Sequence, residues 1–342
     1  MHFFYFFAIF PFISFVLQST YRMQESFKNI NLSLEAVRVT EAAALAAAKF
    51  IGTGDEQLAD QSAVLQAHNV LNNLAINGII RVGEGMNGDQ KKLYIGENIG
   101  LLEGPKTDIA ILALEGKSIV ARGGPNPLSC IALAESGGLL NVPEMYMDKL
   151  VVGPGVPVGT VDLDMDLEQN ISSLAKCKNI LTSELVVCTL DRPRHNAIIS
   201  KLRNIGVKIR LIQDGDVSGA ILTSLIDQEV DMYLGVGAAP QGVLTAAALQ
   251  GMGGWMQGRL LFKNDNERYQ AEKLGINKLN HKYESAEMAM GDVTFAATGV
   301  TYGAILKGVR VVNQTYISNS LVVRSNTSAF RYIEAHHDIN DN

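Results

Sequence analysis

The chain has 342 residues, of which 47% are hydrophobic and 19% charged, and this composition excludes a disordered protein and allows one large or two ordinary domains. The net charge of -6 and the absence of a dense Lys/Arg block argue against nucleic acid as a partner. The three cysteines (Cys130, Cys177 and Cys188) have no CxxC spacing, which predicts small buried thiols in a reducing, cytoplasmic compartment rather than disulfides or a zinc site.

The first 18 residues form an apolar run unlike the rest of the chain. The run approaches the length of a membrane span, but Pro11 interrupts it and no Lys or Arg precedes it. Three interpretations are open: an anchor or signal, a buried helix, or a start codon assigned too early. We favour Met23 as the true start and treat residues 1–22 as an extension. A membrane partner is expected only if residues 1–18 are a real anchor.

Helices and strands alternate from residue 33 onward. Residues 33–50 are rich in Ala and Leu at helical spacing, and a second helix is expected from Asp60 to Leu74. The second half repeats a strand followed by a helix, which predicts a mostly parallel α/β sheet. Antiparallel strands are expected in the tail, residues 309–336. The predicted strands are 79–82, 108–114, 128–133, 184–189, 207–212 and 231–236, and the later helices are 194–204, 216–226 and 242–249.

A Gly/Pro-rich stretch at residues 153–159 predicts a domain boundary. We expect an N-terminal α+β domain, residues 29–155, that carries a metal site. A C-terminal α/β domain, residues 156–337, is expected to bind substrate.

Four acidic residues of the first half stand close to glycines: Asp60, Glu84, Glu97 and Glu115. Hydrolysis of a phosphate monoester needs cations that neutralise phosphoryl oxygens and activate water, and hard ions such as Mn²⁺ and Mg²⁺ prefer carboxylate ligands. A single acid beside a glycine is more often a cap or a turn residue. Four in one half of the chain leave a metal site and a structural role equally open.

Three strand-to-helix junctions in the second half carry groups suited to a sugar phosphate. The guanidinium groups of Arg192 and Arg194 match phosphate geometry. Asp214 and Asp216 follow the next strand, where they would accept sugar hydroxyls or cap the helix. The Gly-rich turn at 235–242 opens a helix whose N–H groups suit an anion. Such junctions define the ligand-binding edge of a parallel sheet.

These residues lie in a series of motifs: GTGD…AD, VGEG, LYIGE, DIA…LEG, PEMYM-KLVVGPG, RPRH, DGDV, G-GAAP-G and FAATGV. Through these motifs, which occur in this order, the chain resembles the class II fructose-1,6-bisphosphatases of bacteria. The resemblance covers residues 29–337, and these enzymes belong to the lithium-sensitive, metal-dependent phosphatase superfamily. The resemblance implies a two-domain layered αβαβα fold with the site between the domains. It also implies Mn²⁺ or Mg²⁺ as cofactor and removal of the 1-phosphate of fructose 1,6-bisphosphate in gluconeogenesis. We further expect a homo-oligomer.

The resemblance also implies roles for individual residues. The metal-ligand positions are occupied by Asp60, Glu84, Glu115 and Gln241, and the catalytic positions by Glu84, Glu115 and Lys117. The substrate-binding positions are occupied by Asn126, Tyr146, Arg192, Arg194, Asp214 and Asp216.

Several positions depart from the family pattern. Leu112 stands where the family has a metal-binding Asp, Lys117 where it has a water-orienting Thr, and Gln241 where it has a Glu. Glu56 replaces a Lys. Losing carboxylates should weaken metal binding, and losing a hydroxyl should slow catalysis.

Two functions therefore stay open: a working phosphatase, and a catalytically degenerate sugar-phosphate-binding or regulatory protein of the same fold. The Lys117 ammonium either stands in for one cation or reflects drift after loss of function.

Overall fold

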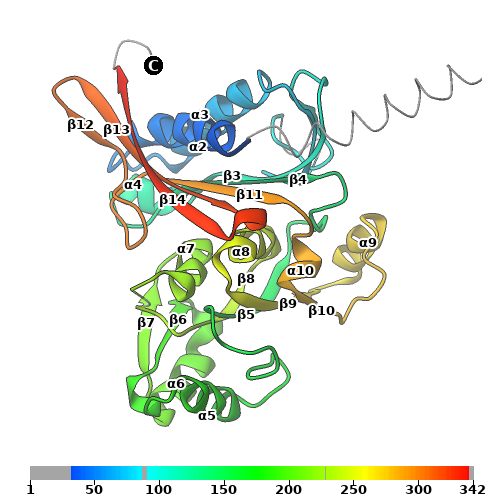
Figure 1. Cartoon of the computed structure of the whole chain (residues 1–342), viewed down its shortest axis with the longest axis vertical. Helices are drawn as coiled ribbons and strands as arrows, with labels where there is room; N and C mark the ends of the chain where they lie inside the picture. The colour runs from blue at the N-terminus through cyan, green and yellow to red at the C-terminus, as the bar shows by residue number, and fades with distance from the viewer. Residues whose placement is uncertain (1–31, 87–90, 228, 339–342) are drawn as a thin grey trace, which may run out of the picture.

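The computed structural model describes residues 32–86, 91–227 and 229–338, so the expectations for residues 1–22 lie outside the described part. Two β-sheets and three helical layers alternate in the order α-β-α-β-α (Figure 1). The predicted layered α/β fold is confirmed, including the antiparallel strands near the C-terminus. None of the helices in these ranges combines the length and the apolar character needed to cross a bilayer.

The first sheet has the strand order β12-β13-β11-β4-β3-β1-β2, with β14 on the other side of β13. Its outer face is covered by α2 (Leu32–Ala48) and α3 (Glu56–Leu71) (Figure 1). Small alanines line α2, which allows this helix to pack closely against both α3 and the sheet. The strands are β1 (Asn77–Val82), β2 (Asn98–Ile99), β3 (Lys106–Glu115), β4 (Leu128–Glu135), β11 (Val293–Gly299), β12 (Arg310–Val312), β13 (Thr315–Arg324) and β14 (Ala329–Asp338).

The second sheet has the strand order β10-β9-β5-β8-β6-β7. Its outer face is covered by α5 (Leu167–Lys178) and α6 (Asn196–Ile205), whose apolar residues pack on β6 and β8. The strands are β5 (Tyr146–Val152), β6 (Val186–Leu190), β7 (Lys208–Ile212), β8 (Met232–Ala238), β9 (Trp255–Leu261) and β10 (Lys282–Glu284).

The expectation of a mostly parallel sheet is wrong. Within the described residues, parallel pairing is confined to β1 with β3, β6 with β7, and β6 with β8. Strand β5 joins the second sheet without a crossover helix, and β9 pairs with β5 rather than β8. The predicted alternation of strand and helix therefore gives parallel pairing in the second sheet only for β6, β7 and β8, which α6 and α7 connect.

The middle layer holds α8 (Ala239–Met252), with α7 (Asp216–Ile221) and α10 (Ser285–Met288) beside it (Figure 1). Nearly all of α8 is buried, and its glycines let both sheets approach closely. A Cβ at Gly242 would lie 2.5 Å from Met147 Sδ of β5, and one at Gly251 would lie 2.4 Å from Val323 Cγ1 of β13. This helix therefore joins the two sheets into one packed body.

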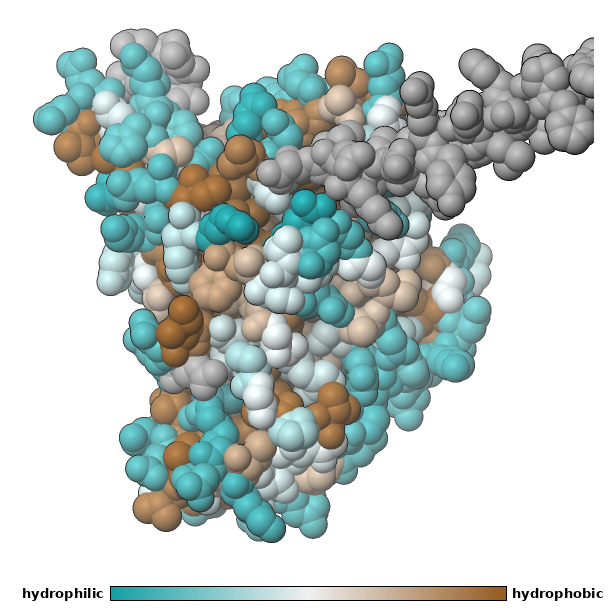
Figure 2. All heavy atoms as spheres, viewed as in Figure 1, coloured by the Kyte–Doolittle hydropathy of each residue, from teal (hydrophilic) through white to brown (hydrophobic). Residues whose placement is uncertain are grey.

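The remaining elements are short or peripheral. Helix α9, which is mostly exposed, lies on the hydrophilic side of the molecule in Figure 2. The thiols of all three cysteines are free, and Cys130 and Cys188 are buried as predicted, whereas Cys177 is exposed. The short or peripheral elements are α4 (Lys117–Arg122), α9 (Asp265–Lys273), and the 3₁₀ turns Thr182–Glu184, Pro193–His195, Leu222–Ser224 and Ser325–Thr327.

The two expected domains, which divide at residues 155 and 156, stay a prediction, and the two sheets do not divide the chain at that point. Strand β5 precedes that point but belongs to the second sheet, and β11–β14 follow it but belong to the first. The chain thus leaves the first sheet after β4, builds the second, and returns.

Candidate active site

One group of predicted residues gathers at Asp60. Asp60 lies on α3, Glu84 follows β1, and Lys117 is the first residue of α4. Lys117 Nζ donates a hydrogen bond to Asp60 Oδ2 at 3.0 Å, and Glu84 Oε1 accepts one from the backbone N–H of Ala113 at 2.7 Å. Asp60 and Glu84 also line a common cavity of about 410 Å³ whose rim includes Lys91 and Lys92.

Electrostatics in this first group are dominated by its carboxylates. Burial, together with the charge of Asp60, raises the pKa of Glu84 to about 7. Partial burial would lower the pKa of Lys117, but its hydrogen bond to Asp60 and the charges of Asp60 and Glu84 raise it instead. Lys117 is therefore a cation across the physiological pH range.

A second group lies where the two sheets face each other across α7. Glu115, at the end of β3, accepts a hydrogen bond from the backbone N–H of Val217 at 3.2 Å. Lys149 of β5 is 1% exposed and donates to Asp216 Oδ2 at 2.5 Å. Burial and the charges of Asp216 and Asp214 raise the pKa of Glu115 well above its usual value. The Glu115 Oε2 atom is buried without a hydrogen-bond partner.

Glycines of β8 make room for this second group. A Cβ at Gly237 would lie only 1.9 Å from Asp216 Oδ2, so a larger residue would displace the carboxylate. Gly235 has φ +150°, and a Cβ there would lie 3.0 Å from His195 Nε2. The backbone of β8 is thus pressed against both side chains.

A third group is built around the ring of Tyr146, the first residue of β5. The Arg194 guanidinium lies 5.1 Å from the ring centroid, and Lys263 Nζ lies 4.2 Å from it. Arg194 is oriented by its Nε, which donates to the carbonyl of Val236 at 2.9 Å. Arg192 lies 4.0 Å from Asp214, both partly exposed. This group presents positive charge that could bind a phosphate.

Two of the remaining predicted residues have different surroundings. Asn126 Oδ1 accepts the N–H of Ala304 at 2.9 Å, and the positive φ of Asn126 (80°) fits a turn residue that holds this loop. Gln241 lies in the first turn of α8, and its Oε1 is buried without a hydrogen-bond partner.

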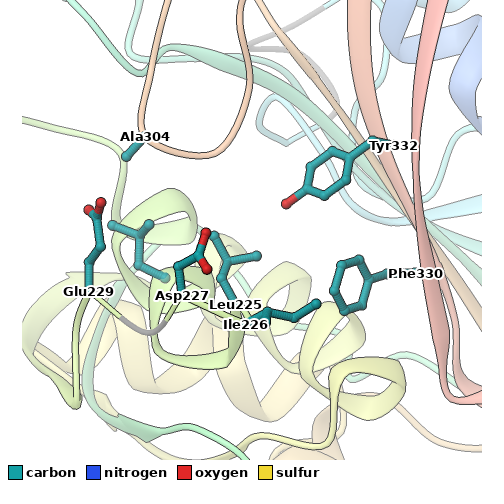
Figure 3. Close-up of a pocket in the computed structure, with 8 residues that line it drawn as sticks. Leu225, Ile226, Asp227, Glu229, Ala304, Phe330 and Tyr332 are labelled. Carbon is teal, nitrogen blue, oxygen red and sulfur yellow. The ribbon is translucent and has the colours of Figure 1, made fainter.

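A separate pocket of about 190 Å³ lies beside β14, and none of the predicted site residues lines it. Asp227 and Tyr332 face each other across it in Figure 3. It plays no part in the site described above. Its lining residues are Leu222, Leu225, Ile226, Asp227, Glu229, Ala304, Phe330 and Tyr332.

Comparison with known proteins identifies the lineage. A family model described as bacterial fructose-1,6-bisphosphatase, glpX-encoded, matches residues 30–337. The chain belongs to this family. It is 38% identical over 319 residues to fructose-1,6-bisphosphatase 1 class 2 of Escherichia coli (strain K12), a match that covers 90% of this chain and 95% of the relative. Fructose-1,6-bisphosphatase class 2 of Shigella flexneri shows the same identity and coverage.

The bacterial fructose-1,6-bisphosphatase family consists of metal-dependent phosphatases, and this chain's donor atoms can be tested against that requirement. In the described ranges, no three His, Cys, Asp or Glu side chains converge as a metal site would require. Lys117 occupies an oxygen of Asp60, and Leu112 offers no donor. This set does not fit a multi-carboxylate cage. Buried oxygens without a hydrogen-bond partner include Glu115 Oε2 and Gln241 Oε1, and also Glu97 Oε2.

Two residues close to the site escaped the sequence analysis. Lys149 lies beside Asp148 in a strand of otherwise apolar and aromatic residues, and a charged residue in such a strand was a usable signal. Lys263 follows β9 in a polar stretch and gave no signal, because only the fold brings it to Tyr146.

Proposed function

We propose that this chain hydrolyses the 1-phosphate of fructose 1,6-bisphosphate. The family relationship supports this activity, and the relatives that share 38% identity carry it in their names. The observation that carries the proposal for this chain is the cationic group at Tyr146. Among the described residues, neither Arg194 nor Lys263 forms an ion pair with a carboxylate, so their charge is available to a phosphate.

In this proposal the substrate lies between the three groups. Arg194 and Lys263 bind the phosphate that is retained, with the Tyr146 ring holding both cations in place. Asp214, partly exposed beside Arg192, accepts a sugar hydroxyl. Asp216 is fixed by Lys149 and orients this end of the site. We propose that these contacts direct the 1-phosphate toward Glu115 and the Asp60 group.

Glu84 is proposed to receive the proton of the attacking water. The water oxygen bonds to phosphorus, the bond from phosphorus to the sugar oxygen breaks, and that oxygen takes up a proton to leave as the hydroxyl. Its pKa of about 7 allows it to accept a proton near neutral pH, and it lines the same cavity as Asp60. No step is assigned to a metal ion, because the donor set does not fit a multi-carboxylate cage. The resident ion, where one binds, is proposed to be Mn²⁺ or Mg²⁺, since oxygen donors favour hard cations. The homo-oligomeric state and the cytoplasmic location stay predictions.

The experiment is phosphate release from fructose 1,6-bisphosphate, with Mn²⁺ and Mg²⁺ titrated separately. We expect turnover by the full chain and a KM raised about 10-fold or more in Arg194→Ala and Lys263→Ala, since a charge-assisted phosphate contact contributes about 1.5–3 kcal/mol.

Lys273→Ala is the matched control, because Lys273 lies 4.5 Å from the ring of Tyr269 outside the site and should leave KM unchanged. Absence of phosphate release with either ion, alongside retained binding of the sugar bisphosphate, would overturn hydrolysis and favour a binding protein.

A further inference from the structure

The position of Lys117 has a local structural cause. The preceding Gly116 adopts φ +87° at the N-cap of α4, which turns the chain sharply at the end of β3. This turn carries the first side chain of α4 toward α3, where Lys117 meets Asp60. The Asp60 side chain is 20% exposed and that of Lys117 is 53% exposed. This ion pair therefore lies at the solvent-exposed edge of the group rather than in its interior.

The charges around Lys117 are those expected around a bound cation. Asp60 contacts it directly, and the charges of Glu84 and Glu56 add to the favourable field at its ammonium group. Glu56 opens α3 one turn before Asp60. The ammonium therefore contacts one carboxylate and is stabilised by the charges of two others, and the three come from two segments of the chain.

A divalent ion and this ammonium group compete for the same oxygen. Mg²⁺ binds carboxylate oxygens at about 2.0–2.1 Å, so an ion on Asp60 Oδ2 would lie within about 5 Å of Lys117 Nζ. At that separation the doubly charged ion and the ammonium repel each other strongly. Leu112 supplies no additional carboxylate that could offset this repulsion.

We propose that Lys117 is a built-in cation that replaces a divalent metal ion between Asp60 and Glu84. A lysine in the place of a metal ion explains why Asp60 and Glu84 are present although the donor set does not fit a multi-carboxylate metal site. The protein then needs fewer metal ions than the carboxylate count implies, and any divalent ion it binds lies on the Glu115 side. The inference rests on the proposed function for its chemistry, but its test requires no turnover.

The test is Mn²⁺ binding by the full chain without substrate, followed by isothermal titration and by electron paramagnetic resonance of the free ion. We expect Lys117→Met, which keeps the length of the side chain and removes its charge, to gain a Mn²⁺ site or to bind Mn²⁺ at least about 10-fold more tightly than the wild type. Adding Asp60→Asn to that variant should abolish the gain. Lys117→Arg, which keeps the charge, should bind Mn²⁺ as the wild type does.

Lys92→Met is the matched control, because Lys92 lines the same cavity but its Nζ contacts His68 rather than Asp60. Equal Mn²⁺ affinity and stoichiometry in the wild type and Lys117→Met would overturn the proposal, as would an equal gain in Lys92→Met. Circular dichroism verifies that each variant is folded. If Lys117→Met fails to fold, Lys117→Thr gives the same readout. Failure of hydrolysis in the phosphate-release assay leaves these outcomes unaffected.

Discussion

Both ring nitrogens of His195 are engaged in the folded chain. Nε2 accepts the N–H of Val236 at 2.8 Å, and Nδ1 lies 2.9 Å from the carbonyl of Leu190, an arrangement that fits the neutral ring with its proton on Nδ1. Burial lowers the pKa of His195. Below the unfolded pKa of about 6.5, the unfolded chain takes up a proton that the folded chain resists, so stability is full above that pH and falls as the pH drops.

The measurement is urea unfolding between pH 8 and pH 5. We expect His195→Gln to be less stable than the wild type at pH 8 and to lose less stability on acidification. His281→Gln serves as control, because His281 is partly exposed and pairs with Glu287 at the surface. Identical pH slopes for the wild type and His195→Gln would contradict the prediction.

For individual residues, the sequence was a better guide to the functional residue types than to the contacts that these residues make. The idea that the Lys117 ammonium stands in for a cation followed from the family resemblance, and in the structure Lys117 contacts Asp60. Lys149 was missed although its charge in a mostly apolar strand was a signal, and its partner Asp216, 67 residues away in the chain, is revealed only by the fold. The contact of Asn126 with Ala304 joins segments 178 residues apart, which no local pattern reveals.

At the level of elements, β8 shows how backbone spacing sets the site. We expect Gly237→Ala to destabilise the protein by about 2–4 kcal/mol, because its Cβ would push Asp216 away from Lys149 and disturb a buried ion pair. Gly206→Ala is the control: it has open space around it but φ +89°, so only backbone strain of about 1–2 kcal/mol is expected. Chemical denaturation compares them, and equal losses would contradict a special role for Gly237.

Part of the helices and strands was predictable, but β5, α5, β9, α9 and β11 were not among the expected elements. The expected strands at 79–82, 108–114 and 128–133 correspond to β1, β3 and β4 within a few residues. Strand direction was harder, because β5 and β9 pair antiparallel through contacts that hydrophobic periodicity does not encode. The site group at Glu115 depends on that pairing, since β5 carries Lys149.

Across the whole molecule, α8 is the shared core of both sheets. We expect Gly251→Ala to destabilise both together, because its Cβ would lie 2.4 Å from Val323 and 3.0 Å from the backbone of Arg324 in a tightly packed interface. The free energy of unfolding should fall by about 1–3 kcal/mol in a single transition. Trp255 fluorescence reports on the second sheet and circular dichroism on the whole chain. Two separate transitions would show that α8 does not couple the sheets.

The return of the chain to the first sheet has a consequence for biosynthesis. Strands β5–β10 are contiguous in sequence, so the second sheet can form while the ribosome is still at work. Strand β4 instead lacks its second neighbour until β11 is synthesised, because β11 pairs Val293 with Ala134. Strand β14, which pairs with β13, is the last strand of this sheet to be made. A nascent chain therefore exposes an unpaired β4 edge from the synthesis of Glu135 until that of Val293. Loss of the last strand should harm folding of the first sheet, although that strand contributes no residue to the site.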